Sequence, residues 1–183
     1  MSGELHITSN IIDGDWYTGP VYAATGVLVL QSTAPFVESN TISNTNVGIY
    51  VESINPDDTD NATISLNTIT ATHEYDGIVL CANSSTATRN IINVADESGI
   101  NVAACAESAP TDVVTSNTIN GACAGILVAP PASATTTPDT YYNVGTPVLS
   151  SLTDTCATPL VKKQNGSGPH RAVASPARRK LSQ

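Results

Sequence analysis

Positively charged side chains are scarce in this sequence. Of its 183 residues only 7 are Lys or Arg, against 16 Asp or Glu, and the formal net charge is −9. Residues 1–161 contain every carboxylate but a single base, Arg89, whereas all the other bases fall in residues 162–183. An acidic body of this kind repels nucleic acid and phospholipid head groups. The partners that remain are neutral glycans, cations, or none.

Long hydrophobic runs are also absent. No segment approaches the roughly 18 consecutive apolar residues of a membrane-spanning helix. The amino end lacks the charged segment, apolar core and small-residue cleavage site of a secretory signal. No stretch shows the three- and four-residue spacing of an amphipathic helix. We therefore expect a chain of short strands with no membrane span and no visible export signal.

What the sequence does contain is a repeat. Asparagines that stand two residues before an isoleucine recur at intervals of 30, 27, 23 and 27 residues. They are Asn10, Asn40, Asn67, Asn90 and Asn117, followed by Ile12, Ile42, Ile69, Ile92 and Ile119. A weaker sixth copy is assigned to Asn143, where Gly145 replaces the isoleucine. The second half of each unit begins at a glycine with apolar residues one and three places later: Gly26, Gly48, Gly77, Gly99 and Gly125.

This repeat predicts a parallel β-helix, because a propeller blade needs about 40 residues and four strands. Coils stacked about 4.8 Å apart turn equivalent positions into columns. We expect the isoleucines to fill the core, the asparagines to occupy a tight corner and bond to neighbouring coils, and the glycines to turn the chain into the next strand. The prediction is one right-handed parallel β-helix solenoid over residues 1–160, with five full coils and a degraded sixth, followed by a disordered basic tail over residues 161–183.

The first coil has no visible cap. The repeat has already begun by Leu5, and nothing before it could cover an open sheet edge. We therefore expect the sequence to be part of a longer solenoid, or copies of it to associate end to end through this coil.

The four cysteines are Cys81, Cys105, Cys123 and Cys156. None lies in a CxxC pair and the histidines do not cluster near them, which argues against zinc. Buried free thiols and disulfides both stay open as interpretations. Cys81 and Cys105 follow the glycines of successive repeats by four and six residues, so their side chains could approach. The offset stretches their separation toward the limit for a disulfide.

The repeated Asn-x-Ile with Gly-Ile-x-Val resembles the right-handed parallel β-helix superfamily of pectate lyases, and within it the short-repeat type of carbohydrate-binding proteins and sugar hydrolases. The resemblance covers roughly residues 5–150. It implies a carbohydrate-associated protein, and we expect an extracellular or cell-surface location. In the resembling enzymes, polysaccharide lies along the outward face of the strand after the glycine, where catalytic carboxylates and bases project.

Strict alternation places one uncharged column on that face: Leu28, Tyr50, Val79, Asn101 and Leu127. A lyase needs a base there and a hydrolase needs two facing carboxylates, so the column argues against catalysis. The remaining catalytic candidates are Glu52, His73, Glu74 and Asp76, with Asp96 and Glu97 one coil later. His73 would act as the base, oriented by Asp76 or Glu52. The alternative interpretation is that these are loop residues that keep an acidic protein soluble.

Neutral glycan could stack on the aromatic side chains of Trp16, Tyr17, Tyr22 or Tyr50 and form hydrogen bonds with Asn101. Asp57, Asp58 and Asp60 could supply oxygen ligands to calcium, although they lack the spacing of the twelve-residue calcium loop. No other cofactor is expected. We therefore predict a non-catalytic, carbohydrate-associated or structural β-helix module. The alternative is a fragment of a polysaccharide lyase, hydrolase or epimerase that acts near Glu52, His73 and Asp76.

Overall fold

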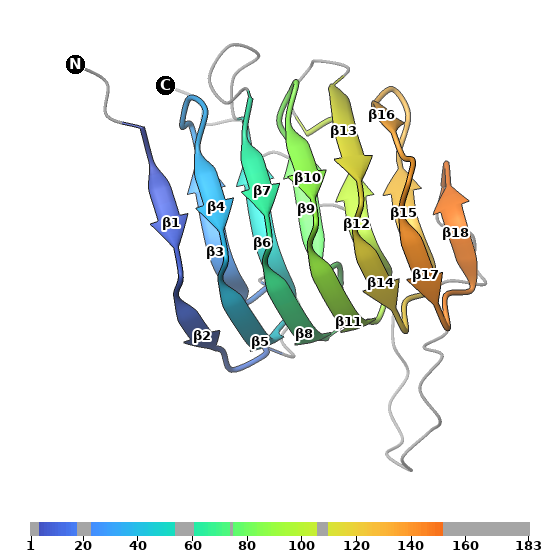
Figure 1. Ribbon diagram of the computed structural model, residues 1–183, viewed down its shortest axis with the longest axis horizontal. Helices are drawn as coiled ribbons and strands as arrows, with labels where there is room; N and C mark the ends of the chain where they lie inside the picture. The colour runs from blue at the N-terminus through green and yellow to red at the C-terminus, as the bar shows by residue number, and fades with distance from the viewer. Residues whose placement is uncertain (1–3, 18–22, 54–60, 74, 106–109, 152–183) are drawn as a thin grey trace, which may run out of the picture.

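The computed structural model describes residues 4–17, 23–53, 61–73, 75–105 and 110–151. These residues form 18 short strands in three parallel sheets of six (Figure 1). Each coil contributes one strand to each sheet, so sequential strands belong to different sheets. The predicted all-β parallel solenoid is confirmed. Within the described ranges, no helix is long and apolar enough to cross a membrane.

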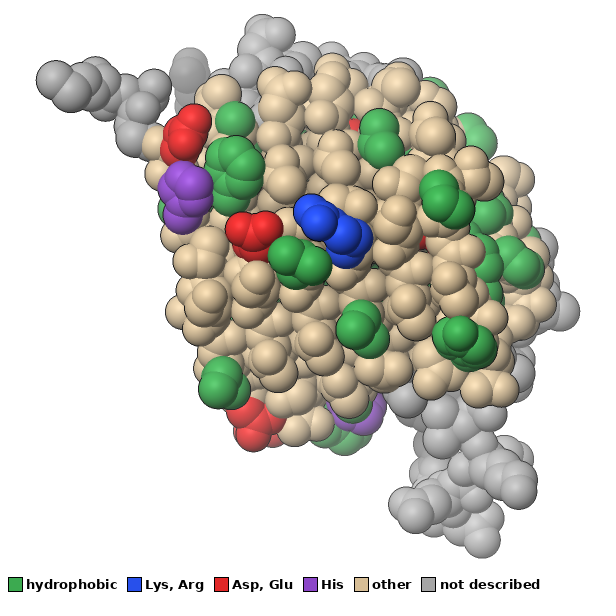
Figure 2. All heavy atoms as spheres, in the orientation of Figure 1, with side chains coloured by type: hydrophobic (Ala, Val, Ile, Leu, Met, Phe, Trp, Pro, Cys, Tyr) green, Lys and Arg blue, Asp and Glu red, His purple; other side chains and the backbone are tan. Residues whose placement is uncertain are grey.

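Two sheets lie at the front of Figure 1 and the third lies behind them. The first sheet contains β1 (His6–Thr8), β4 (Phe36–Glu38), β7 (Thr63–Ser65), β10 (Thr86–Thr88), β13 (Thr111–Thr115) and β16 (Ser133–Thr135). The second contains β2 (Ile11–Asp13), β5 (Thr41–Thr45), β8 (Thr68–Thr72), β11 (Ile91–Ala95), β14 (Thr118–Asn120) and β17 (Thr140–Tyr142). The third contains β3 (Thr25–Leu30), β6 (Val47–Glu52), β9 (Ile78–Cys81), β12 (Ser98–Val102), β15 (Ala124–Val128) and β18 (Thr146–Leu149). The face made by the first two sheets is mostly uncharged, as Figure 2 shows.

The isoleucine column is in register along the second sheet. Each isoleucine pairs with the isoleucine of the next coil, from Ile12 to Ile119. Ile42, Ile69, Ile92 and Ile119 are fully buried. Ile12 is only partly buried, because among the described residues it has a neighbouring coil on one side only. Ile119 of the fifth coil pairs with Tyr141 of the sixth, which packs against the core in place of an isoleucine. The register predicted from Asn143 and Gly145 is therefore wrong.

The asparagine column is a hydrogen-bonded ladder, as predicted. Asn67 is a typical member: its Oδ1 accepts from the backbone N and the Nδ2 of Asn40, both at 3.0 Å. Its Nδ2 donates to the Val37 carbonyl at 2.9 Å and to Asn90 Oδ1 at 3.0 Å. Every donor and acceptor of this buried amide is thereby satisfied.

The tight corner predicted at these asparagines is made by the residue before each of them, which has a left-handed backbone angle. Those residues have φ between 55° and 61°, and they are Ser9, Ser39, Leu66, Arg89 and Ser116. The left-handed residue turns the chain between the first and second sheets. The asparagine that follows is therefore free to serve the ladder.

The glycine column is needed for close approach, not for the turn predicted from sequence. A Cβ on Gly48 would lie 2.5 Å from the Gly77 carbonyl oxygen and 2.6 Å from Ile69 Cγ2. The glycine therefore faces the isoleucine column, and the residue after it also faces the core. Because two consecutive residues point inward, the residue before each glycine lies on the outer face of the third sheet. Strict alternation did not predict this.

Candidate functional site

The outer face of the third sheet carries the column predicted to point outward, which we call the outer strip: Leu28, Tyr50, Val79, Asn101 and Leu127. Its members are paired in register across the coils. Leu28 is 54% exposed, but Val79 and Leu127 are only 5% and 4% exposed. The face is thus not an open groove along its whole length.

A small apolar cluster covers the middle of the outer strip. It consists of Val47, Val79 and Cys81, against which Tyr50, Tyr75, Ala103 and Cys105 pack. A disulfide joins Cys81, at the end of β9, to Cys105, which follows β12, with a Cα–Cα distance of 5.2 Å. The sequence left free thiols and disulfides open, and the structure shows a disulfide between Cys81 and Cys105. Cys123 is disulfide-bonded as well.

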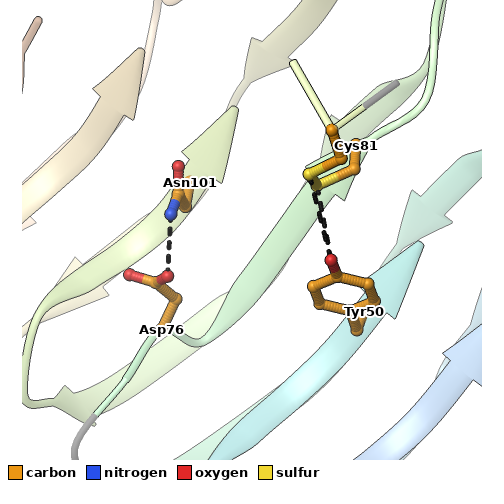
Figure 3. Close-up of a disulfide and its surroundings, with 5 residues drawn as sticks. Tyr50, Asp76, Cys81 and Asn101 are labelled. Atoms are coloured by element: carbon orange, nitrogen blue, oxygen red, sulfur yellow. Dashed lines mark hydrogen bonds between the residues drawn. A yellow bond between two sulfur atoms is a disulfide. The ribbon is translucent and has the colours of Figure 1, made fainter. Parts of the chain in front are cut away.

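Tyr50 points toward this disulfide (Figure 3). Its hydroxyl oxygen lies 3.7 Å from the sulfur of Cys81 and 3.9 Å from that of Cys105. Burial, together with the neighbouring Glu52 carboxylate, raises the pKa of Tyr50 to about 12. Tyr50 is therefore half-buried packing in the covered part of the strip, and its ring is not an open platform for a sugar.

Asp76 lies just before Gly77, on the outer side of the sheet. Its Oδ1 accepts from the backbone N of Ser98 at 3.0 Å and from the Ser98 hydroxyl. Its Oδ2 accepts from Asn101 Nδ2 at 2.9 Å (Figure 3). Burial raises the pKa of Asp76, and the bonds from Ser98 and Asn101 oppose that shift in part. The outer strip therefore has a carboxylate beside it that the predicted column lacked.

Glu97 is a further titratable group at this corner. Its pKa is raised to about 7, chiefly by burial and then by the charges of Asp76 and Asp96. Its backbone N donates to the Tyr75 carbonyl at 3.2 Å. The sequence placed Glu97 near the catalytic candidates but gave it no role. The signal that singles it out, its burial beside another carboxylate, is visible only in the fold.

The three catalytic candidates that the structure describes, Glu52, His73 and Asp76, do not form one constellation. Glu52 ends β6 and pairs with Cys81, whereas Asp76 precedes the start of β9, so they lie at opposite ends of neighbouring strands. The ring of His73 stacks on Trp16, with centroids 4.5 Å apart. Asp76 instead engages Ser98 and Asn101. The candidates Glu74, Tyr22, Asp57, Asp58 and Asp60 lie outside the described residues.

Two predicted ligand-binding residues, Trp16 and Tyr17, lie on the segment between β2 and β3. With His73 they form what we call the aromatic corner. Trp16 is 43% exposed and Tyr17 is 44% exposed. The Trp16 and His73 rings are inclined by 29°, so one face of the indole is supported by the imidazole. The aromatic corner thus exposes two large rings to solvent, and the Trp16 ring is packed on His73.

Asn46, which the sequence did not single out, anchors the aromatic corner. It lies between β5 and β6 and is fully buried. Its Oδ1 accepts from the backbone N of Tyr17 at 2.8 Å and of Ala24 at 2.9 Å. Its Nδ2 donates to the carbonyls of Tyr17 at 3.0 Å and His73 at 3.1 Å. The only sequence signal was an asparagine one coil after the longest insertion.

The description "Periplasmic copper-binding protein (NosD)" is that of a protein family whose pattern matches residues 2–143. Comparison with curated proteins and with solved structures gave no match. The family pattern therefore covers every described coil except the last strand, β18.

The described residues do not fit a copper centre. Copper prefers imidazole, thiolate and thioether ligands. The described cysteines are all in disulfides, so they offer no thiolate. His6 stacks on Phe36 in the first sheet, and His73 stacks on Trp16 at the corner. In the part of the chain that the structure describes, no three His, Cys, Asp or Glu side chains are grouped to hold a metal ion.

Proposed function

We propose that this chain, which belongs to the periplasmic copper-binding protein (NosD) family of right-handed parallel β-helices, is a non-catalytic, glycan-binding β-helix module of an extracytoplasmic compartment. The aromatic corner is its binding site. The proposal rests on one observation: Trp16 and Tyr17 keep about two-fifths of their surface exposed, at 43% and 44%, on a backbone that is fixed.

Fixed aromatic rings suit sugar binding for a physical reason. The apolar C–H face of a sugar ring packs on an indole or phenol ring, and that contact releases water from both. Binding also costs side-chain and loop entropy, and this cost is smaller when the rings are held before the ligand arrives. Exposed aromatic side chains without such anchoring would lose more of the contact energy.

The charge of the molecule favours a neutral glycan. An acidic polysaccharide needs Arg or Lys to hold its carboxylates. Among the described residues Arg89 is the one Lys or Arg, and it lies at the turn between the first and second sheets, away from the aromatic corner. The acidic side chains of the body would repel an anionic chain.

Three observations support the non-catalytic, extracytoplasmic part of the proposal. The outer strip is covered in its middle by the apolar cluster around Val79, so a polysaccharide has no continuous path along it. Disulfides such as Cys81–Cys105 persist in oxidising compartments, among them the bacterial periplasm. The family description, which is periplasmic, points the same way.

The test is a glycan array of neutral and acidic oligosaccharides, with a product assay on every ligand that binds. We expect neutral glycans to bind without turnover, and Trp16→Ala to weaken binding about tenfold or more. Tyr142→Ala is the matched control, because Tyr142 is 56% exposed but lies on the second sheet. Binding that survives Trp16→Ala, or the absence of any glycan ligand, would overturn the proposal.

A polysaccharide-processing enzyme is the second candidate function. The observation in its favour is the pair Asp76 and Glu97, since a carboxyl group with a pKa of about 7 can act as a general acid or base at neutral pH. Turnover of an array ligand that disappears in Glu97→Gln and survives in Trp16→Ala would select this function instead.

A further inference from the structure

We infer that Asn46 is the positioning residue of the aromatic corner: its single amide sets where the Trp16 and Tyr17 rings stand for a ligand. The inference rests on the proposed function for its ligand, but the position of the rings can be measured without one.

Asn46 binds the backbone of Tyr17, the residue after Trp16, and of Ala24, the residue before β3. The backbone N atoms of Tyr17 and Ala24 converge on the same oxygen, at 2.8 and 2.9 Å. Tyr17 is held a second time through its carbonyl, which accepts from Asn46 Nδ2 at 3.0 Å. Because Tyr17 is fixed at both its N–H and its carbonyl, the preceding residue, Trp16, has little backbone freedom.

The same amide also holds the partner on which Trp16 stacks. Asn46 Nδ2 donates to the His73 carbonyl at 3.1 Å, and the His73 backbone N donates to the Thr45 carbonyl at 2.8 Å. The two stacked rings therefore stand on backbones that are tied to adjacent residues of the second coil. Their 4.5 Å separation follows from that common anchor.

The role of Asn46 differs from that of the ladder asparagines. A ladder asparagine bonds to its equivalent in the next coil and so stabilises coil stacking, as Asn67 does with Asn90. All four side-chain hydrogen bonds of Asn46 go to the backbone of Tyr17, Ala24 and His73. At the equivalent place, two residues before the glycine, the next two coils have Tyr75 and Glu97. An asparagine is thus not required there for stacking.

The sequence supplies a site-specific probe, because Trp16 is the one tryptophan in the chain. Its fluorescence therefore reports on the aromatic corner alone. We would measure acrylamide quenching of Trp16 in wild type, Asn46→Ala and Asn46→Asp, and the affinities of cellohexaose, xylohexaose and mannohexaose. Asn67→Ala is the matched control, a buried and fully bonded asparagine that does not contact the corner.

In Asn46→Ala we expect the quenching constant of Trp16 to rise at least twofold and glycan affinity to fall at least tenfold. Asn46→Asp keeps the two accepted bonds and loses the two donated ones, so its quenching should be intermediate; if Asn46→Ala does not fold, this variant decides the question. Asn67→Ala should lower the melting temperature while the folded protein keeps wild-type quenching and affinity. A purely structural role of Asn46 would reproduce the Asn67→Ala result.

The outcomes separate the two claims. Changed Trp16 quenching in the Asn46 variants of a protein that binds no glycan would leave the positioning role standing and remove the proposed function. Glycan binding that depends on Trp16 but is the same in wild type and both Asn46 variants, with unchanged quenching, would overturn the inference and leave the proposed function.

Discussion

Asn117 donates to Asp139 through both its backbone N, at 2.8 Å, and its side-chain Nδ2, at 3.0 Å. This is the last step of the ladder, and it repeats the geometry of each earlier step with a carboxylate oxygen in place of an amide oxygen. Within the ladder an asparagine must both accept and donate, whereas Asp139 only has to accept. Its second oxygen is buried and has no hydrogen-bond partner among the residues that the structure describes.

Asp139→Asn should be close to neutral or slightly stabilising at pH 7. Burial raises the pKa of Asp139, so the ionised carboxylate is disfavoured in the fold, although the bonds from Asn117 oppose this. A neutral amide can still accept both bonds and avoids the desolvation of a charge. We expect a change of no more than about 1 kcal/mol, measured by urea unfolding. A loss of several kcal/mol would show that the negative charge itself is needed.

Asn67→Ala, in the middle of the ladder, should be much more damaging. It removes four hydrogen bonds and leaves the Val37 carbonyl and the Asn40 amide groups buried without those partners. Each unsatisfied buried group costs about 1–3 kcal/mol, so we expect a loss of about 3 kcal/mol or more in the free energy of unfolding. Thr70→Ala is the control, since Thr70 is exposed on the same coil. Equal midpoints for the two variants would contradict the ladder's role.

Gly77→Ala should destabilise the fold by about 3 kcal/mol or prevent folding. The new Cβ would lie 2.6 Å from the Gly99 carbonyl oxygen and 2.7 Å from Ile92 Cγ2. The first of these is backbone and cannot move without separating two coils. Thermal unfolding followed by far-ultraviolet circular dichroism measures the effect. A wild-type melting temperature would mean that the coils tolerate a methyl group between them.

Stability should fall as the pH rises from about 4.5 to about 7. The pKa of Glu97 is about 7 in the fold against an ordinary value of 4.5 in the unfolded chain, so between these values the native state retains a proton that the unfolded chain releases. This stabilisation is fully present below the pKa of the unfolded chain and is lost as the pH rises through the pKa of the fold. The loss in the free energy of unfolding is on the order of 3 kcal/mol at most. The raised pKa of Asp76 acts with the same sign.

Glu97→Gln should therefore flatten the pH dependence of urea unfolding, without abolishing it. Asp13→Asn is the informative comparison, because hydrogen bonds from Ser43 and Asn44 lower the pKa of Asp13. The stability that Asp13 contributes is complete above pH 3.8 and is lost only at lower pH, so Asp13→Asn should leave the decline between pH 4.5 and 7 as in wild type. An identical slope in wild type and Glu97→Gln would contradict the assignment.

Reduction of the Cys81–Cys105 disulfide should lower stability by about 3 kcal/mol, the value expected for a closed loop with a sequence separation of 24. The double variant Cys81→Ser with Cys105→Ser should show the same loss without reductant. Peptide mapping under non-reducing conditions tests the pairing directly. Wild-type protein whose unfolding midpoint does not shift with a phosphine reductant, once thiol titration shows that the bond is reduced, would contradict the prediction.

The columns of the repeat were predictable because stacking imposes one environment on equivalent positions. Ile42 in the core and Asn67 in the ladder could be predicted from the sequence, since a β-branched core and an amide ladder each favour one residue type. The sixth coil was not predicted correctly, because other residue types fill its equivalent positions. Asp139 and Tyr141 occupy the positions of the ladder asparagine and the core isoleucine. A search for the Asn-x-Ile motif therefore assigned Asn143 instead.

The candidate site was less predictable, because its parts depend on departures from the repeat. Two inward-facing residues at each glycine place Asp76 beside Asn101, although alternation assigns them to different faces. Asn46 matters through four bonds to backbone atoms of distant residues, and residue types do not encode such bonds. The exposure of Trp16 was the one site property that composition and the insertion already indicated.

The ladder also gives the solenoid a rule for growth. The bonds from one side-chain amide to the next run in one direction, from each coil to the coil after it, and a coil that carries an asparagine can be copied between two others without breaking the series. A coil that carries an aspartate at this position accepts hydrogen bonds from the coil before it, but its carboxylate donates none to a coil after it. Duplication of internal coils is therefore compatible with the fold. Residue 139 ends the series of amides because it is an aspartate, whose second side-chain atom is an oxygen and not the nitrogen that an asparagine would use as donor.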